Sequence, residues 1–156
     1  MTIEVGQEAP DFTLKGPGGE PVTLTSFRGK KNVVLMFYPL AFSSTCTTQF
    51  TSVRTHERRY AGEDTQVLGV SVDGHHAQAA FARSLGLDGT LLLADFEPKG
   101  EVARAYGVYR DQAGHSGRAT FVIDKEGIVR RADVAPPGAL PDEGAALAAL
   151  AACNNS

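Results

Sequence analysis

The chain has 156 residues, of which 42% are hydrophobic and 21% charged, and its 15 basic and 18 acidic residues give a formal net charge of −3. This length supports one hydrophobic core, so we expect a single domain over residues 1–156. The slight acidic excess argues against nucleic acid as a partner, and the absence of an apolar run of roughly 18 residues or of a signal-like N-terminus argues against a membrane partner and predicts a cytoplasmic location.

The first half of the chain predicts a hairpin and then two buried strands, each followed by a helix. In chain order we expect strands over 11–14 and 21–24, a short turn or helical step over 25–29, a strand over 33–38, a helix to about Gly62, a strand over 65–72 and a helix over 77–85. Gly16-Pro-Gly-Gly19 is the expected hairpin turn. The unbroken apolar run of residues 33–38 is typical of a strand buried on both faces, and Pro39 ends it. Asp73 is the expected cap of the second helix and Gly86 its end.

The second half predicts a short buried strand, a short helix, a hairpin and a final helix. The expected ranges are a strand over 91–94, a helix over 99–106, strands over 118–124 and 128–134, and a helix that begins near Pro141 and continues through Leu147 and Leu150. Lys125-Glu-Gly127 is the expected turn of the hairpin. Pro141 suits the first position of its helix, with Asp142 and Glu143 in the first turn. The order of elements indicates a small α/β fold.

Cys46 lies in the first turn of a helix that follows directly after a buried strand. If Ser43 is the N-cap, Cys46 is the third helical residue, where unpaired backbone N–H groups and the positive end of the helix dipole favour a thiolate. The alternative is a small core residue, because Phe50 and Val53 follow at helical spacing. The chain has a second cysteine, Cys153, and two cysteines are too few for a disulfide framework. They fit a reducing compartment in which one thiol reacts.

Two motifs resemble the active site of the peroxiredoxins. Pro39-Leu-Ala-Phe-Ser43-Ser-Thr-Cys46 has the family's spacing of Pro, Ser or Thr, and Cys after an apolar strand, and Arg118-Ala-Thr-Phe-Val-Ile-Asp124 resembles the strand that carries its distant arginine. The resemblance runs nearly end to end. It is closest to the one-cysteine alkyl hydroperoxide reductase E type of actinobacteria, as in Phe37-Tyr-Pro-Leu-Ala-Phe42 and Ala105-Tyr-Gly-Val108. It implies a thioredoxin-like fold, with a central mixed sheet flanked by helices and an N-terminal β-hairpin extension.

The resemblance also implies a thiol-dependent peroxidase that reduces hydrogen peroxide or alkyl hydroperoxides and needs no metal or other cofactor. Cys46 would be the nucleophile that becomes a sulfenic acid, and Arg118 would contact both thiolate and peroxide. Ser43 would hydrogen-bond the peroxide, and Pro39 would shield the thiolate from water. Members of the family often carry Glu at the position of Gln49. The amide of Gln49 can accept a hydrogen bond but cannot pair with Arg118 as an anion, so its part in the site stays open.

Three apolar residues near the thiol, Leu40, Phe42 and Phe50, indicate a mouth that admits alkyl chains, although they could equally be core or dimer contacts. We take Leu40, Phe42 and Gln49 as candidate substrate-binding residues. The resemblance further implies a homodimer. The spacing of the four histidines is not that of a metal site. They are His56, His75, His76 and His115.

Cys153 is the candidate resolving cysteine, but its place at the end of the last helix matches none of the family's usual positions. We therefore expect an external reductant, which would be a low-molecular-weight thiol, a thioredoxin or a glutaredoxin-like protein. The lack of a C-x-x-C motif argues against a disulfide reductase. The alternative function is a thioredoxin-like peroxide sensor in which Cys46 passes its oxidation to a protein partner.

Overall fold

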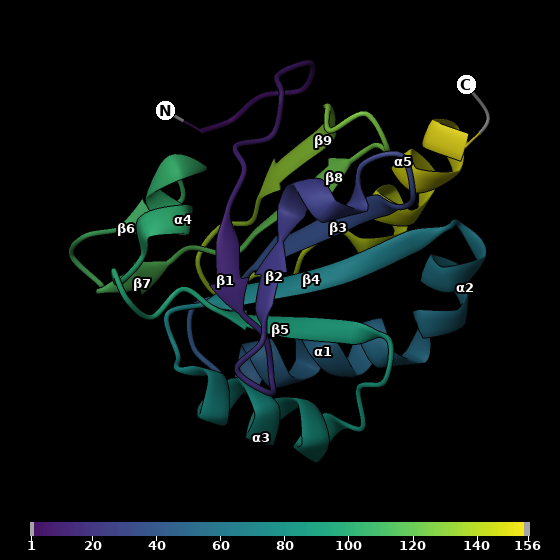
Figure 1. Ribbon diagram of the computed structural model, residues 1–156. Helices are drawn as coiled ribbons and strands as arrows, with labels where there is room; N and C mark the ends of the chain where they lie inside the picture. Colours follow the sequence, from purple (N-terminus) through teal and green to yellow (C-terminus); the bar gives the residue numbers. More distant parts are fainter. Residues whose placement is uncertain (1, 155–156) are drawn as a thin grey trace.

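The computed structural model describes residues 2–154 and is organised around a seven-stranded mixed sheet with the strand order β2-β1-β5-β4-β3-β8-β9 (Figure 1). The strands are β1 Thr13–Lys15, β2 Pro21–Thr23, β3 Asn32–Phe37, β4 Thr65–Ser71, β5 Thr90–Ala94, β8 Ala119–Ile123 and β9 Val129–Val134. β3 pairs in parallel with β4 and antiparallel with β8. All six residues of β3 are buried, which confirms the strand expected from the apolar run.

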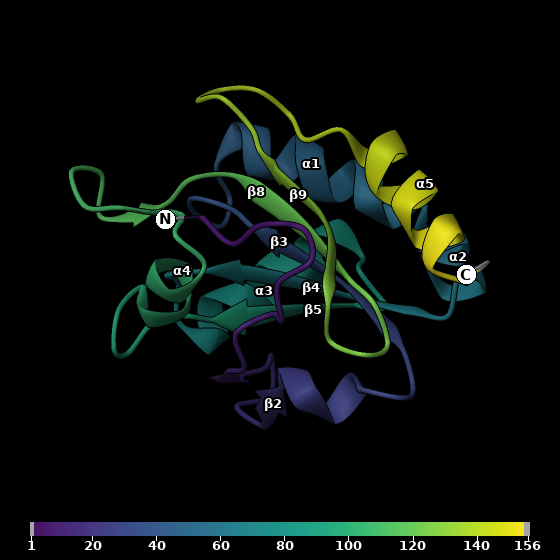
Figure 2. The ribbon, with the colours of Figure 1, turned by 90° about the horizontal axis from the view of Figure 1, so that it is seen from above.

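Helices cover both faces of the sheet (Figures 1 and 2). They are α1 Ser44–Thr55, α2 Glu57–Gly62, α3 His75–Leu85, α4 Glu101–Ala105, α5 Glu143–Asn154 and the 3-10 helix η1 Leu24–Phe27. The side chains of α1, α2, α3 and α5 share one core with Val34 and Met36 of β3. Those of α4 and η1 pack in a second core with Leu35 and Phe37. Alternate residues of β3 therefore serve opposite faces, as strand geometry requires. Within residues 2–154, no helix has both the length and the apolar character needed to cross a membrane.

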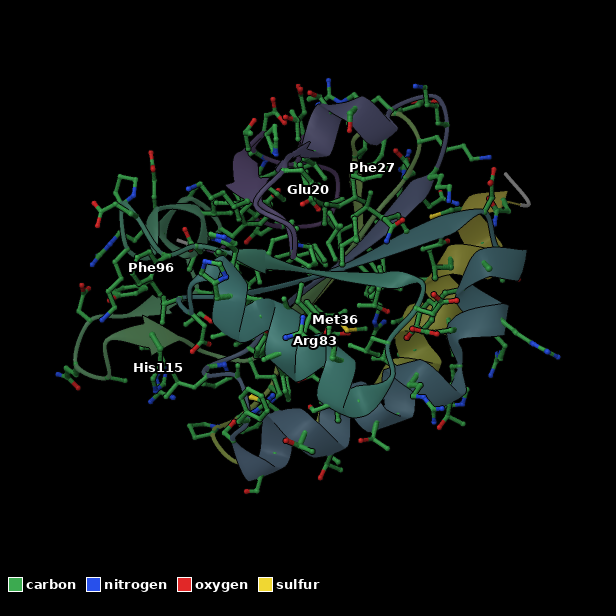
Figure 3. All side chains as sticks on the ribbon, turned by 60° about the horizontal axis from the view of Figure 1, so that its bottom comes forward. Glu20, Phe27, Met36, Arg83, Phe96 and His115 are labelled. Atoms are coloured by element: carbon green, nitrogen blue, oxygen red, sulfur yellow. The ribbon has the colours of Figure 1, made fainter. Side chains whose placement is uncertain are left out.

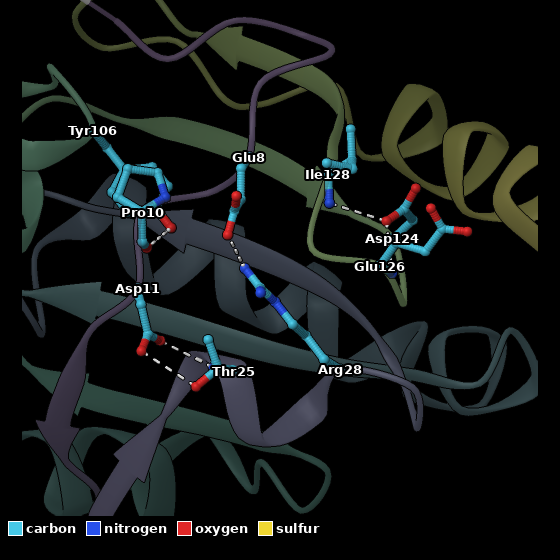
Figure 4. A network of polar contacts seen from close by, with 9 residues as sticks. All are labelled: Glu8, Pro10, Asp11, Thr25, Arg28, Tyr106, Asp124, Glu126 and Ile128. Carbon is cyan, nitrogen blue, oxygen red and sulfur yellow. Dashed lines mark hydrogen bonds and ion pairs between the residues drawn. The ribbon is translucent and has the colours of Figure 1, made fainter.

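The predicted N-terminal hairpin forms and joins the sheet at its edge, where Lys15 pairs with Ala94 of β5. Polar contacts hold the segment before it in place (Figure 4). The hydroxyl of Tyr106 donates to the carbonyl of Pro10 at 2.7 Å, and Asp11 accepts a hydrogen bond from the backbone of η1 at 3.0 Å. These bonds tie the N-terminal segment to elements that follow later in the chain.

The helices of the first half differ from the expected ones at two points. The helix expected to reach Gly62 is interrupted at His56, so that α1 ends at Thr55 and α2 continues from Glu57 to Gly62. Asp73 does not cap α3, whose N-cap is Gly74. Its carboxylate instead accepts a hydrogen bond from the backbone N–H of Ala41 at 2.8 Å.

The second half has three further differences. Pro141 is not the first residue of α5, because Asp142 takes the capping position and accepts a hydrogen bond from the N–H of Ala145 at 3.0 Å. α4 is shorter than the expected helix over 99–106. A separate hairpin of β6 Tyr109–Arg110 and β7 His115–Ser116 was not predicted, since two-residue strands show no periodicity.

Candidate active site

Cys46 is the third residue of α1 and its side chain is fully buried. Ser43 occupies the N-cap position, as the sequence predicts, but its hydroxyl does not cap the helix. It donates instead to the carbonyl of Leu40 at 2.9 Å. The backbone N–H groups of the first turn therefore donate no hydrogen bond to the N-cap side chain, and their partial positive charge favours an anion beside them.

Arg118 immediately precedes β8, the strand that pairs with β3, and it lies beside Cys46. β3 and β8 are antiparallel, with Phe37 opposite Ala119, so the residue before β8 lies at the end of β3 from which the chain leads into α1. Arg118 is 7% exposed, and its Nη1 donates to Cys46 Sγ at 3.2 Å. A buried cation at this distance attracts negative charge that develops at the sulfur. The residues of β8 alternate between the two faces of the sheet, because Val122 faces the core of Cys46 while Ala119 faces the other core.

Gln49 lies one turn after Cys46 and is also buried. Its Oε1 accepts a hydrogen bond from Nη1 of Arg118, the same nitrogen that contacts the sulfur. Its Nε2 lies 3.7 Å from Sδ of Met36, which Figure 3 shows in the interior between the sheet and the helices. The neutral amide thus helps to orient the arginine, a role that the sequence left open.

The loop between β3 and α1 exposes two of the apolar residues expected at the mouth. Leu40 is 42% exposed and Phe42 is 55% exposed. Phe42 has a φ of 67°, a strained backbone conformation for a residue with a side chain, and its ring centroid lies 5.1 Å from that of Phe81. Phe50 is fully buried and belongs to the core, which resolves the alternative that the sequence left open.

A buried network of hydrogen bonds beneath this loop was not predicted, because no sequence motif indicates it. The hydroxyl of Tyr38 donates to Gln78 Oε1, and Gln78 Nε2 donates to Ser71 Oγ at 2.8 Å. Ser71 in turn donates to Asp73, the residue that accepts the N–H of Ala41 in the loop. Burial raises the pKa of Tyr38, so its hydroxyl stays protonated as a donor in the network. The network fixes the loop that carries the exposed apolar residues.

Cys153 lies far from Cys46. It is half-buried near the end of α5, and burial raises the pKa of its thiol. The next residue, Asn154, accepts a hydrogen bond from the side chain of Asn32 at 2.8 Å and so lies beside the first residue of β3. Cys46 lies in the first turn of α1, which the chain enters from the other end of the same strand, and six strand residues span about 17 Å. A disulfide needs Cα atoms within about 7 Å, so these two cysteines of one chain are not placed to form one.

The polar groups nearest the sulfur suit an anion and a small oxygen compound. Among residues 2–154, no three His, Cys, Asp or Glu side chains come together as metal ligands. Arg118 supplies charged N–H donors, the start of α1 supplies backbone donors, and the hydroxyl of Ser43 keeps its lone pairs available. Such an arrangement can activate a thiolate and stabilise negative charge that develops on a departing oxygen.

Comparison with known proteins gives consistent matches along most of the chain. Residues 5–132 match the AhpC/TSA family. The chain is 41% identical over 150 residues to alkyl hydroperoxide reductase E of Mycobacterium bovis, covering 96% of this chain and 97% of that protein. It is 39% identical over 133 residues to peroxiredoxin Bcp of Bacillus subtilis, covering 81% and 82%. The crystal structure of peroxidoxin BcpB from Mycobacterium tuberculosis matches with a TM-score of 0.86 at 32% identity, over 96% of this chain and 97% of that one.

Proposed function

Because this chain belongs to the AhpC/TSA family of peroxiredoxins, we propose that Cys46 is its peroxidatic nucleophile and that it acts without a resolving cysteine. The protein is a thiol-dependent peroxidase, and its thioredoxin-like fold agrees with the fold predicted from the sequence. The observation that carries the proposal is the 3.2 Å contact between Arg118 Nη1 and Cys46 Sγ in a buried site.

The proposed reaction begins with attack of the Cys46 thiolate on one oxygen of the hydroperoxide. An S–O bond forms as the O–O bond breaks, which yields a sulfenic acid and an oxyanion, and a proton from solvent converts the oxyanion to water or an alcohol. Arg118 and the N–H groups at the start of α1 stabilise the charge on the departing oxygen. Ser43 accepts the O–H of the peroxide while it donates to the carbonyl of Leu40, and Pro39 keeps water from the thiolate.

Hydroperoxides as a class are the substrates of this family, and the range within that class is part of our proposal. Leu40 and Phe42 offer exposed apolar surface on the loop that leads into the helix of the nucleophile. This surface suits the chain of an alkyl hydroperoxide, and hydrogen peroxide needs no such contact. The same exposed residues could be covered by a second copy, so the homodimer and the cytoplasmic location both stay predictions.

The reductant in our proposal is an external thiol, either a small molecule or a thioredoxin- or glutaredoxin-like protein. The placement of Cys153 near the start of β3, opposite the end that leads to Cys46, supports this proposal. The sulfenic acid would then condense with the incoming thiol, and a second thiol would release Cys46 and leave a disulfide between the two reductant sulfurs.

The experiment that tests the proposal measures intact mass after one equivalent of hydrogen peroxide, together with the rate of peroxide loss, for the parent, Cys46→Ser and Cys153→Ser proteins. We expect the parent and Cys153→Ser to gain oxygen at the same rate and Cys46→Ser to be inert. Loss of two hydrogens in the parent would show a disulfide and overturn the one-cysteine mechanism. Peroxide consumption by Cys46→Ser at the parent rate would overturn the assignment of the nucleophile. Repeated turnover with a small thiol separates the enzyme from a sensor, whose oxidised form would persist until a partner protein arrived.

A further inference from the structure

The backbone ladder between β3 and β8 ends just before it reaches Arg118. The last paired residues of the two strands are Phe37 and Ala119. On the β3 side, the N–H of Tyr38 donates to a carbonyl of β4 instead, and Pro39 has no N–H to offer. On the β9 side, the carbonyl of Arg118 accepts an N–H from the residue after β9 at 2.9 Å. Main-chain pairing with β3 therefore stops one residue short of the cation.

The side chain of Ser116 makes a connection to β3 at the place where the ladder stops. Ser116 is the last residue of β7 and is 1% exposed. Its hydroxyl donates to the carbonyl of Tyr38 at 3.1 Å. Ser116 lies two residues before Arg118, and Tyr38 directly precedes Pro39. The bond thus joins the segment that carries the guanidinium to the segment that leads into the helix of the thiol.

The hairpin of β6 and β7 holds Ser116 in place. Tyr109 pairs with Ser116 across the hairpin, and the N–H of Gly117 donates to the carbonyl of Val108 at 2.9 Å. Figure 1 shows this hairpin outside the seven-stranded sheet, beside α4. Gly117, the one residue between Ser116 and Arg118, has no side chain and so offers no bond of the same kind. The hydroxyl of Ser116 is therefore well placed to set where the arginine begins.

We propose that Ser116 is a positioning residue of the peroxidase reaction, which holds Arg118 at its distance from Cys46 through the bond to the carbonyl of Tyr38. Nη1 of Arg118 lies 3.2 Å from Sγ, and such contacts weaken as their geometry worsens. Loss of the hydroxyl leaves a buried carbonyl without this donor, so the segment shifts. A displacement of about 1 Å near a reacting group can cost up to about a hundredfold in rate. The proposal rests on the proposed function, because it assigns a part in the same reaction.

The test measures the rate of Cys46 oxidation by hydrogen peroxide, by quenched flow and intact mass, in variants of Ser116. We expect Ser116→Ala to react about tenfold more slowly than the parent. Ser116→Thr keeps the hydroxyl and should react within about threefold of the parent rate. A rate within about threefold of the parent in Ser116→Ala, or an equal loss in Ser116→Thr, would overturn the proposal. If Ser116→Ala does not fold, Ser116→Val replaces it, because Val and Thr have nearly the same shape and differ in the hydroxyl.

Thr65→Val is the matched control. Thr65 is 6% exposed, and its hydroxyl also donates to a backbone carbonyl, that of Glu63, at 3.0 Å. It begins β4 and pairs with Asn32, which lies at the end of β3 opposite to the one that leads into α1. Thr65→Val should react at the parent rate. An equal slowing in Thr65→Val and Ser116→Ala would assign the effect to the loss of any buried hydroxyl and overturn the proposal.

A double-mutant cycle with Arg118→Met separates positioning from a general loss of stability. If Ser116 acts through the guanidinium, Ser116→Ala should change the rate by less than about twofold in the Arg118→Met background. An undiminished tenfold loss there would overturn the proposal. Cys46→Ser, measured alongside, should be inert. Peroxide consumption by Cys46→Ser at the parent rate would refute the proposed function, whereas a parent rate in Ser116→Ala beside an inert Cys46→Ser would refute the positioning role alone.

Discussion

Replacement of Arg118 by Met is the sharpest test of the active-site geometry. At 3.2 Å, the attraction between the guanidinium and a thiolate is about 5 kcal/mol at an effective dielectric constant of 20. Desolvation of the two groups offsets part of this attraction. Loss of a donor aimed at developing negative charge costs about 3 to 4 kcal/mol in other enzymes, so we expect Arg118→Met to slow oxidation of the cysteine about 10²- to 10³-fold.

The assay is quenched-flow oxidation by hydrogen peroxide scored by intact mass, because the chain has no Trp whose fluorescence could report the reaction. Arg104→Met is the control, since Arg104 is half-exposed and pairs with Asp111 on the surface. It should react at the parent rate. A decrease of less than about threefold in Arg118→Met, with the variant folded, would refute the role of the arginine.

Three other predictions concern stability. Gly69→Ala should lower the free energy of unfolding by about 1 to 3 kcal/mol in urea titration, because the new Cβ would lie 2.6 Å from Cδ2 of the buried Leu92. Tyr38→Phe should cost about 1 to 3 kcal/mol in the same assay by leaving Gln78 Oε1 without its donor. Burial alone would raise the pKa of Asp124, but hydrogen bonds outweigh it and hold the pKa below the ordinary 3.8. The ionised form of Asp124 thus contributes stability above pH 3.8, and this contribution is lost as the pH falls through the lowered pKa. Asp124→Asn should therefore have a lower free energy of unfolding than the parent at pH 7. Urea titrations at acid pH should show that the difference becomes smaller.

Each stability prediction has a contrary result. Gly89→Ala is the control for the first, because a Cβ there meets no atom within 4 Å; an equal loss in both variants would refute the clash with Leu92 as the cause. An unchanged unfolding free energy in Tyr38→Phe would mean that Gln78 finds another donor. A constant difference between Asp124→Asn and the parent across pH would separate the effect from ionisation.

The parts of the fold that were predictable from the sequence rest on local signals. The apolar run of β3 and the polar residues before Cys46 specify a buried strand and a helix start within a few residues of each other. The alternation along β8 is equally local, and it predicts the face on which Thr120 lies. A cap that failed depends on a contact from elsewhere, because Asp73 leaves the capping role to bind a loop thirty-odd residues earlier.

The candidate site shows the same division. The approach of Arg118 to Cys46 depends on the register between two strands, which no local pattern encodes, and it was expected only from the resemblance to a family. The role of Gln49 could not be settled from the sequence because an amide has no charge to indicate its partner. Gln78 and Ser71 were missed for a similar reason, since single polar residues on apolar elements look like surface positions until the fold buries them.

The pairing of β3 with β8 also sets the order in which the site can come into being. The chain is synthesised from its N-terminus, so Cys46 emerges 72 residues before Arg118, the arginine that contacts its sulfur. Until β8 docks beside β3, the thiol has only its helix start, and a slip of one residue in the register would turn Arg118 to the opposite face. Peroxide reactivity therefore reports completion of this one long-range pairing. In refolding experiments, a short peroxide pulse at successive times should label the cysteine rapidly only after β8 has joined the sheet, and early labelling at the full rate would contradict this order.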